Sequence, residues 1–358
     1  MGVFEAIGSD THEEVLYGYD HVSGLRTIIA IHSSALGPAL GGTRFYPYAS
    51  EEDALRDVLR LSRGMTYKSS AAGLDLGGGK AVIIGDPRTM KTERLLRAYG
   101  NIVDSLDGRY ITAEDVGTTT TDMAMVSRET QWVAGLPAEL GGSGDPSPAT
   151  ARGVMNAMRA VADHLWGTED LSGRTVAVQG VGKVGAELVA RLARTGAATV
   201  ITDVDETALR MVSETYSSTV VGTDEIYDAD CDIFAPCALG ASLNPETIPR
   251  LKCEAVVGSA NNQLESDEDA NRLVDAGITY APDFVVNAGG IINVAVGIGG
   301  YEVRRAATAI DNIQFAVSDV LTAAKERGIN PHEAAVEVAQ ERIDQIGTLR
   351  RHRGLRRT

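Results

Sequence analysis

The spacing of apolar and polar residues changes several times along the first 135 positions, and each change predicts a different element. Residues 25–31 (LRTIIAI) are apolar and β-branched, which favours a strand. The segment after them, residues 36–50 (LGPALGGTRFYPYAS), is rich in turn residues. At Ser50 the period becomes helical, and Ser50 can cap the start of an amphipathic helix. One face of that helix is formed by Ala54, Val58, Leu61 and Met65.

Two further strands and a hinge are predicted before the middle of the chain. The glycine-rich stretch 71–87 (AAGLDLGGGKAVIIGDP) contains AVII, which we interpret as a short buried strand bounded by turn residues. A second strand is expected at 109–115 (RYITAED). Residues 135–148 (GLPAELGGSGDPSP) contain so much glycine, proline and serine that no regular element is expected, and we place the domain hinge there.

The second half of the chain alternates regularly between strand and helix. A helix is expected from Thr150 to about Leu165. Strands are expected after it at 174–180, 198–205, 231–236, 255–261 and 278–283. Such alternation predicts a mostly parallel sheet covered by helices on both faces. A helical tail follows over about 301–350, and its periodicity does not show which half it packs against.

Length and charge narrow the class of protein. A chain of 358 residues is long for one core and fits two domains. Its apolar residues (44%) and charged residues (23%) are in the proportions of a soluble globular protein. The net charge of -16 argues against a nucleic-acid partner, because phosphates need a basic face. The one basic run, interpreted as a solvated tail, is Arg350, Arg351, Arg353, Arg356 and Arg357.

Targeting and cysteine patterns favour a cytoplasmic protein. The first residues, MGVFEAIGSDTHEE, have neither a basic start nor the apolar run of a signal peptide, and no stretch of about 20 apolar residues predicts a membrane span. The cysteines Cys231, Cys237 and Cys253 show no metal-ligand spacing. We therefore expect reduced thiols and no bound metal.

A glycine pattern in the second half indicates a dinucleotide site. Gly180, Gly182 and Gly185 form Gly-x-Gly-x-x-Gly between a predicted strand and a predicted helix. In such a turn the glycines permit a tight bend, close approach of a pyrophosphate, and close packing of helix on strand. The helix N-terminus adds amide donors and a positive dipole end. The expected contacts are Gly180, Val181, Gly182, Lys183, Val184, Gly185 and Ala186, with Lys183 facing solvent.

An acidic residue at the end of the next strand specifies the cofactor. Asp203 follows the glycine turn by about 20 residues, the interval at which a carboxylate accepts hydrogen bonds from the adenosine ribose. Its charge would repel a 2′-phosphate, so NAD is expected rather than NADP. The alternative role, capping the next helix, suits its neighbour Asp205 better.

The residues that could carry chemistry lie upstream. Lys68 and Lys80 bracket GLDLGGGK, and Asp115 lies in ITAEDVGT. Three glycines before a lysine cost backbone entropy unless something approaches the chain closely there. A lysine in a desolvated cleft can act as a general base on water. For an arbitrary glycine-lysine pair, however, two surface lysines beside a turn would be the simpler interpretation.

Eight stretches, in order and over nearly the whole chain, resemble the glutamate, leucine, phenylalanine and valine dehydrogenase superfamily, in particular its leucine/valine branch. They are LGPALGGTR, RGMTYKSSAAGLDLGGGKAVIIGDP, RYITAEDVGT, GDPSPATA, AVQGVGKVG, CDIFAPCALG, GSANNQL and YAPDFVVNAGG. The resemblance implies an α/β protein of two domains with the active-site cleft between them. A substrate and oligomerisation domain is expected over 1–140, joined by a C-terminal helix at 330–358, and a doubly wound Rossmann NAD-binding domain over 141–329.

The resemblance also implies roles for single residues in a reversible oxidative deamination. Lys80 is the general base for water, Lys68 binds the substrate α-carboxylate with help from Asn262, and Asp115 exchanges protons with the amino group. These roles suit a zwitterionic amino acid, which needs a cation for its carboxylate and an acid for its ammonium. Thr150 matches the position that bonds the nicotinamide carboxamide, and it is also a candidate helix N-cap. Asn262 is expected to contact the cofactor as well.

The positions implied to line the side-chain pocket are small or aliphatic: Leu40, Gly41, Ala113, Ala134, Ile291 and Val294. Such a pocket fits leucine, valine or isoleucine and offers no cation for a glutamate side chain. One methylene changes binding by only about 1–3 kcal/mol, so preference should be graded. Ala134 stands where leucine dehydrogenases have threonine, which leaves the preferred substrate open.

Three alternatives remain at this stage. Phenylalanine dehydrogenase of the same family would need a deeper pocket. A silent dinucleotide-binding regulatory protein would not be expected to keep Lys68, Lys80, Asp115 and Asn262 together. A hydroxy-acid or tetrahydrofolate dehydrogenase would share the Rossmann half but would not predict GGGK before the glycine turn. The family also implies a homo-oligomer, with the strand-rich N-terminal region as a plausible interface.

Overall fold

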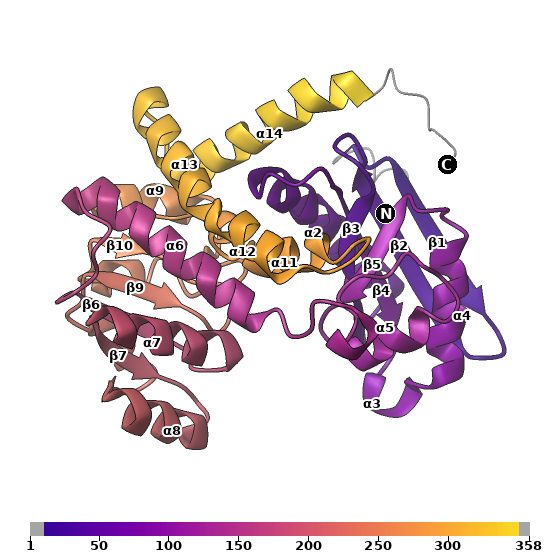
Figure 1. Ribbon diagram of the computed structural model, residues 1–358, viewed down its shortest axis with the longest axis horizontal. Coiled ribbons are helices and arrows are strands. Elements are labelled where there is room, and N and C mark those ends of the chain that lie inside the picture. Colours follow the sequence, from indigo (N-terminus) through magenta and orange to yellow (C-terminus); the bar gives the residue numbers. More distant parts are fainter. Residues whose placement is uncertain (1–10, 351–358) are drawn as a thin grey trace. The chain divides into compact units, whose positions relative to one another are not determined.

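The apolar run at 25–31 forms strand β2 (Leu25–Ser33) in the computed structural model, which describes residues 11–350. The chain divides into two units (Figure 1). Among the described residues, the first unit contains residues 11–145, 294–303 and 339–350. The second contains residues 146–293 and 304–338. The predicted α/β class with a parallel sheet in the second half is confirmed.

The first unit is built on a five-stranded sheet of order β1-β2-β4-β3-β5. Besides β2, its strands are β1 (Glu14–Asp20), β3 (Ala39–Tyr46), β4 (Gly77–Ile84) and β5 (Tyr110–Glu114). Strands β4, β3 and β5 are parallel, whereas β2 is antiparallel to β4, and β1 to β2. The carboxyl ends of three neighbouring strands therefore lie at one edge of the sheet, where ligand sites form in α/β proteins.

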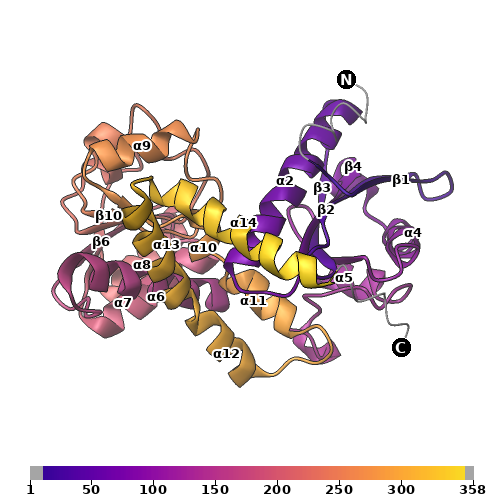
Figure 2. The same ribbon diagram turned by 90° about the horizontal axis from the view of Figure 1, so that it is seen from above.

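Helices cover both faces of this sheet (Figure 2). On one face, α2 (Glu51–Ala71) packs on Ile28 and Val82, and on the other, α4 (Glu93–Asp104) and α5 (Thr120–Val126) pack on Ile29 and Ile83. The alternation follows from the two-residue period of a strand. Helix α2 starts as predicted, since the Ser50 hydroxyl accepts a bond from the Asp53 amide. Its buried face is rotated from the predicted one, because Leu61 and Met65 are only half-buried.

Two glycine-rich segments predicted as turns are strands instead. The turn-rich segment 36–50 contains β3, and the three glycines before Lys80 begin β4. Every residue of β4 is buried. A Cβ on Gly78 would lie 2.1 Å from the backbone nitrogen of Thr66 in α2, and one on Gly79 would lie 2.8 Å from the Tyr110 ring. Close approach does explain the glycines, but the approaching groups belong to the protein itself.

The second unit contains a six-stranded, fully parallel sheet of order β11-β10-β9-β6-β7-β8. The strands are β6 (Thr175–Gln179), β7 (Ala198–Thr202), β8 (Thr219–Val220), β9 (Ile233–Pro236), β10 (Ala255–Val256) and β11 (Thr279–Tyr280). Numbered within the unit this order is 3-2-1-4-5-6, the doubly wound order of dinucleotide-binding domains. The strand order reverses between β6 and β9, where such sheets bind ligands.

Helix α6 (Ser147–Trp166) packs between α13 (Ile313–Arg327) and α7 (Lys183–Thr195), and α7 packs on strands β6 and β7 of this sheet. The remaining helices are α3 (Pro87–Met90), α8 (Glu206–Tyr216), α9 (Glu268–Asp275), α10 (Asp283–Val286), α11 (Gly289–Val296), α12 (Val303–Asp311) and α14 (Pro331–Arg350), with short 3-10 turns at 138–140, 225–228 and 248–250. The predicted helical tail is thus three helices. The stretch expected to lack regular structure contains the first of the 3-10 turns.

Three smaller predictions can be compared with the structure. Thr150 is not an N-cap, because α6 begins at Ser147 and the Thr150 hydroxyl donates back to the Pro146 carbonyl at 3.0 Å. The three cysteines are free thiols. The arginine run beyond Arg350 lies outside the described residues. Within residues 11–350, no helix is both long and apolar enough to cross a membrane.

Candidate active site

Lys80 lies inside strand β4, on the face of the sheet that α2 covers. It shares this face with Val82 and Ile84, two and four residues further on, and pairs in register with Ala30 of β2. Its side chain is only 7% exposed. A buried ammonium needs a partner, and Lys80 Nζ lies 2.9 Å from Asp115 Oδ2.

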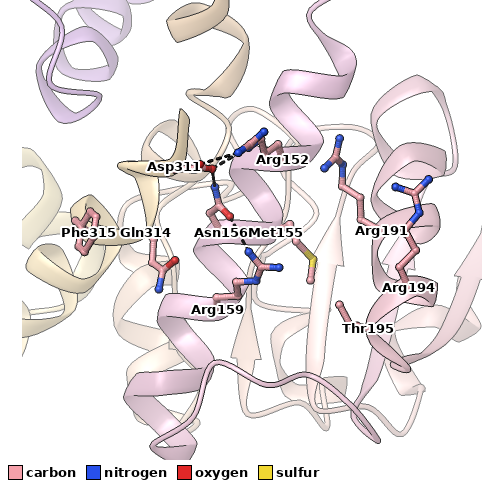
Figure 3. Close-up of a pocket in the computed structure, with 10 residues that line it drawn as sticks. All are labelled: Arg152, Met155, Asn156, Arg159, Arg191, Arg194, Thr195, Asp311, Gln314 and Phe315. Atoms are coloured by element: carbon pink, nitrogen blue, oxygen red, sulfur yellow. Dashed lines mark hydrogen bonds and ion pairs between the residues drawn. The ribbon is translucent and has the colours of Figure 1, made fainter. Parts of the chain in front are cut away.

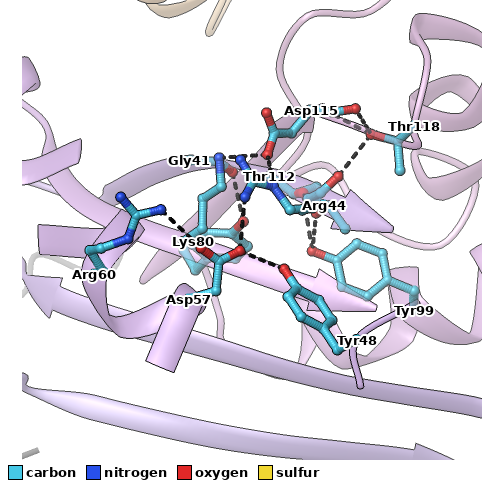
Figure 4. A network of polar contacts seen from close by, with 12 residues as sticks. Gly41, Arg44, Tyr48, Asp57, Arg60, Lys80, Tyr99, Thr112, Asp115 and Thr118 are labelled. Atoms are coloured by element: carbon cyan, nitrogen blue, oxygen red, sulfur yellow. Dashed lines mark hydrogen bonds and ion pairs between the residues drawn. The ribbon is translucent and has the colours of Figure 1, made fainter. Parts of the chain in front are cut away.

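Asp115 directly follows β5, at the carboxyl edge of the three parallel strands. Its backbone N–H donates to the Thr118 hydroxyl at 2.9 Å, and that hydroxyl donates to the Thr43 carbonyl of β3 at 2.8 Å. Its carboxylate oxygen Oδ2 forms the ion pair with Lys80 and also accepts a hydrogen bond from the Nε of Arg44 at 3.1 Å (Figure 4). The sheet therefore fixes both the backbone and the charged end of Asp115.

The electrostatics of this pair favour an ionised carboxylate. Burial alone would raise the pKa of Asp115, but the charges of Lys80 and Arg44 outweigh it and hold the pKa below its ordinary value. Asp115 thus carries its negative charge at neutral pH while it accepts from two cations. The arrangement can bind an ammonium group or pass a proton to and from one.

The network extends to residues that the sequence did not identify. Arg44 Nη1 lies 2.8 Å from Asp57 Oδ2 of α2, and the Tyr48 hydroxyl donates to the same oxygen at 2.6 Å. Burial and this bond raise the pKa of Tyr48. Arg44 belongs to LGPALGGTR, one of the stretches that carry the family resemblance, and nothing else in the sequence pointed to it. No sequence motif pointed to Asp57 or Tyr48.

The structure places Lys68 and Asn262 on separate units. Lys68 lies in the last turn of α2, whose neighbouring residues Thr66 and Ser69 contact Gly78 and Gly77 at the start of β4. Asn262 is an exposed residue of the second unit with a left-handed backbone (φ 52). Its carbonyl accepts a bond from the Ala241 N–H at 2.7 Å. Lys80 and Asp115 are therefore the two predicted catalytic residues seen in direct contact.

Most of the predicted side-chain pocket lies in the first unit and is buried. Leu40 and Gly41 belong to β3, Ala113 to β5, and Ala134 pairs with β5 through its N–H to the Thr112 carbonyl. A Cβ built on Gly135 would lie 3.7 Å from Val294 Cγ2. Ile291, on the same helix as Val294, belongs to the second unit.

The glycine turn has the geometry of a phosphate cradle. Gly180 is left-handed (φ 98), and a Cβ on Gly185 would lie 2.0 Å from the Gly180 carbonyl oxygen, so α7 approaches the turn closely. A Cβ on Gly182 would meet nothing within 4 Å. Gly182 is the N-cap of α7, and no acidic residue occupies the first turn. Two glycines therefore serve local packing, while the middle one borders open space.

The other predicted cofactor contacts surround this turn or lie on α6. Asp203 follows β7, and its Oδ2 accepts the Val181 N–H at 2.6 Å, which links the carboxylate to the glycine turn. Asp205, as expected, caps α8. Lys183 is exposed, as expected. A Cβ on Gly290 would lie 2.9 Å from the Thr150 hydroxyl, so the start of α11 packs on the first turn of α6.

Comparisons with known proteins agree with this architecture. Residues 12–132 match the model described as Glu/Leu/Phe/Val dehydrogenase, dimerisation domain, and residues 141–211 and 199–351 match Glutamate/Leucine/Phenylalanine/Valine dehydrogenase. A leucine dehydrogenase of Thermoactinomyces intermedius is 50% identical over 347 residues, which cover 97% of this chain and 94% of that protein. A valine dehydrogenase of Streptomyces coelicolor is 51% identical over 335 residues, or 93% and 92% of the two chains.

A solved structure extends the likeness to three dimensions. The L-tryptophan dehydrogenase from Nostoc punctiforme superposes with a TM-score of 0.87 at 43% sequence identity, over 96% of this chain and 99% of that one. The resemblance predicted from eight sequence stretches is thereby confirmed. Family models cover both halves of the chain, and the relatives at about half identity are named dehydrogenases of amino acids. The chain belongs to the glutamate, leucine, phenylalanine and valine dehydrogenase family and is an amino-acid dehydrogenase.

Proposed function

We propose that the protein is an NAD-dependent dehydrogenase of branched-chain L-amino acids. The overall reaction converts the amino acid, water and NAD⁺ into the 2-oxo acid, ammonium, NADH and a proton. The observation that carries the proposal is the buried ion pair of Lys80 and Asp115 at the carboxyl edge of three parallel strands. A second observation is the glycine turn after β6, which lies where the strand order of the second sheet reverses.

In this proposal the chain's own side chains bind the zwitterion and move its protons. Lys68, assisted by Asn262, pairs with the α-carboxylate, and Asp115 accepts the ammonium group and takes up its proton. Lys80 acts as a general base only in its neutral form, after its ammonium group has lost a proton. Once the α-carbon has lost a hydride, water attacks it while neutral Lys80 accepts a proton from that water. Asp115 then returns its proton to the nitrogen. As the carbon–nitrogen bond breaks and ammonia leaves, the carboxylate of Asp115 accepts the hydroxyl proton, which leaves the carbonyl.

The second unit would hold the cofactor, which supplies the hydride acceptor when bound. The open space at Gly182 and the N-terminus of α7, which has no side-chain cap, suit a pyrophosphate. Asp203 would exchange its bond to the Val181 amide for the adenosine ribose hydroxyls, and its charge favours NAD over NADP. Thr150 would bond the nicotinamide carboxamide.

The choice of substrate rests on buried, uncharged pocket positions. Leu40, Gly41, Ala113 and Ala134 offer no cation for an acidic side chain. Leucine and valine dehydrogenases among the relatives support an aliphatic substrate. The tryptophan dehydrogenase among the solved structures makes an aromatic amino acid the second candidate.

A substrate panel tests the proposal directly. The full-length protein is mixed with leucine, valine, isoleucine, phenylalanine or tryptophan and with NAD or NADP, and reduced nicotinamide is followed by absorbance. We expect the highest kcat/KM with an aliphatic branched substrate and NAD. Faster turnover of phenylalanine or tryptophan would select the aromatic alternative, and turnover of none of them would contradict the proposed substrate class.

The role of Lys80 can be separated from a merely structural one. Lys80→Ala is expected to lower kcat by about 10²–10⁴ fold, the usual contribution of a general base, while NAD affinity changes little. Lys91→Ala is the matched control, because Lys91 also forms a short ion pair, with Asp122 in the same unit (2.7 Å). Comparable loss of activity in both variants would contradict the assignment.

We also propose that the protein is a homo-oligomer. The match of residues 12–132 to a dimerisation domain supports this, and it falls on the sheet of the first unit. Light scattering coupled to gel filtration tests it: a mass near the 37.8 kDa of one chain would contradict the proposal.

A further inference from the structure

A hollow in the second unit is lined by arginine, although the chain as a whole carries a net charge of -16. Its volume is about 600 Å³, within the range of small-molecule sites. Arg152 and Arg159 extend from α6, and Arg191 and Arg194 from α7, so that four guanidinium groups from two helices surround one space (Figure 3). Asp311 is the single acidic residue of the lining.

One side of the hollow is fixed in place. Arg152 forms a two-pronged ion pair with Asp311, with Nε to Oδ1 at 2.8 Å and Nη2 to Oδ2 at 2.6 Å. The buried amide of Asn156 donates to Oδ1 as well, at 2.8 Å. All of these bonds use the acceptors of Asp311. Its charge is therefore directed mainly at Arg152 and Asn156, with a weaker electrostatic interaction with Arg159.

The positive charge of the other side is incompletely compensated. Arg191 pairs with Glu187 at 2.8 Å, but its Nε is buried and has no hydrogen-bond partner among the described residues. Arg159 donates to the amide oxygen of Asn156 at 3.3 Å, and neither it nor Arg194 has a carboxylate oxygen within 4.0 Å in residues 11–350. Favourable interaction with the C-terminus of α7 explains Arg194. It does not explain Arg159, which lies inside α6.

We propose that this hollow binds the phosphate group of a small molecule, at a site separate from the glycine turn. Guanidinium groups match phosphate oxygens in pairs, and several arginines around one space are the arrangement that recognises a dianion. Gln314 and Thr195 provide further polar groups, and the Phe315 ring, 66% exposed, offers apolar surface near Gln314. The site does not depend on the assignment of the dehydrogenase substrate.

Calorimetric titration of the full-length protein with inorganic pyrophosphate tests the proposal. Saturating NAD is present so that the glycine turn is not available, and ionic strength is held constant because screening weakens such contacts. We expect saturable binding of one pyrophosphate per chain. Arg159→Gln combined with Arg194→Gln should raise its Kd about tenfold or more, since each charged hydrogen bond lost weakens binding. If the double variant fails to fold, Arg194→Gln alone, at an exposed position, replaces it.

The matched control is Arg26→Gln combined with Arg210→Gln. It removes the same formal charge from two exposed arginines outside the hollow, and it should bind pyrophosphate as the wild type does. Equal weakening in both double variants would reduce the effect to overall charge and overturn the proposal. Unchanged affinity in the Arg159/Arg194 variant, absence of saturable binding, or binding that NAD abolishes would overturn it too.

Discussion

Two cations share one carboxylate oxygen in the candidate active site. Lys80 and Arg44 both contact Asp115 Oδ2, and Arg44 is itself held by Asp57. Arg44 touches no reacting atom in the proposed mechanism. It acts through Asp115, by keeping the carboxylate ionised and oriented, and is a positioning residue.

Removing Arg44 should therefore change the pH dependence of the reaction. The charge of Arg44 helps to lower the pKa of Asp115 against the effect of burial, so Arg44→Met should raise that pKa. Because the ionised carboxylate is the form that accepts a proton, the acidic limb of the kcat/KM profile should move to higher pH. The measurement is the profile for deamination between pH 5 and 10.

Two further variants separate position from charge. Arg44→Lys keeps the charge but cannot span Asp115 and Asp57 in the same way. The acidic limb of its kcat/KM profile should therefore lie between those of Arg44→Met and the wild type. Arg60→Gln removes a largely exposed cation that contacts the other oxygen of Asp57 (3.2 Å), and it should leave the limb unchanged. A profile of Arg44→Met that superposes on the wild type would remove Arg44 from the site.

The sequence predicted the residues of this site unevenly, for a physical reason. Lys80 and Asp115 stand in short motifs and could be assigned by resemblance. Asp57 reaches the site only because α2 folds onto the sheet, where its carboxylate accepts bonds from both Arg44 and Tyr48. No local pattern encodes such a contact.

At the scale of elements, the wrong predictions concern segments rich in glycine. Strands β3 and β4 contain glycines, and the sequence therefore predicted turns at these positions. In the fold these glycines allow α2, β3 and Tyr110 to approach to distances that a Cβ would prevent. Strands β6, β7 and β9 were predicted more easily, because buried parallel strands appear as plain apolar runs.

The same reasoning separates two glycines of the dinucleotide turn. Gly185→Ala places a Cβ 2.0 Å from the Gly180 carbonyl oxygen, so α7 must shift, and we expect a loss of about 1–3 kcal/mol in unfolding free energy together with weaker NAD binding. Gly182→Ala meets no atom and has a negative φ (−64) that alanine adopts readily.

For Gly182→Ala we therefore expect wild-type thermal stability with reduced NAD affinity, since the methyl group would occupy the space that we propose for the pyrophosphate. Thermal denaturation and NAD titration of both variants distinguish the two roles. A Gly182→Ala protein that binds NAD as tightly as the wild type would show that the space is not used.

At the scale of the whole molecule, the chain order does not match the spatial units. Residues 294–303 and those from 339 onward belong to the first unit, although the second unit lies between them and residue 145 in sequence. Periodicity identified helices in the tail but not their partners. Arg342 shows why: it donates to the carbonyls of Gly73 and Leu74, nearly 270 residues away.

The positions of the thiols allow the second unit to be followed by chemical labelling in the intact molecule. Cys231, Cys237 and Cys253 all belong to it. Burial raises the pKa of Cys231 to about 12 and that of Cys253 to about 11, and it raises the pKa of Cys237 as well. Because the thiolate is the reactive form, a disulfide reagent at pH 8 should label the native protein slowly and label three thiols per chain in denaturant.

NAD should slow this labelling further. Cys237 directly follows β9 and lies next to the glycine turn, because a Cβ built on Gly185 would lie 3.5 Å from the Cβ of Cys237. We expect reagent to reach its thiol when that region opens locally, and a ligand that binds only the closed form suppresses opening in proportion to its saturation. Gly182→Ala, with weaker NAD binding, should need more NAD for equal protection. Labelling that is indifferent to NAD in the wild type would place cofactor binding away from this turn.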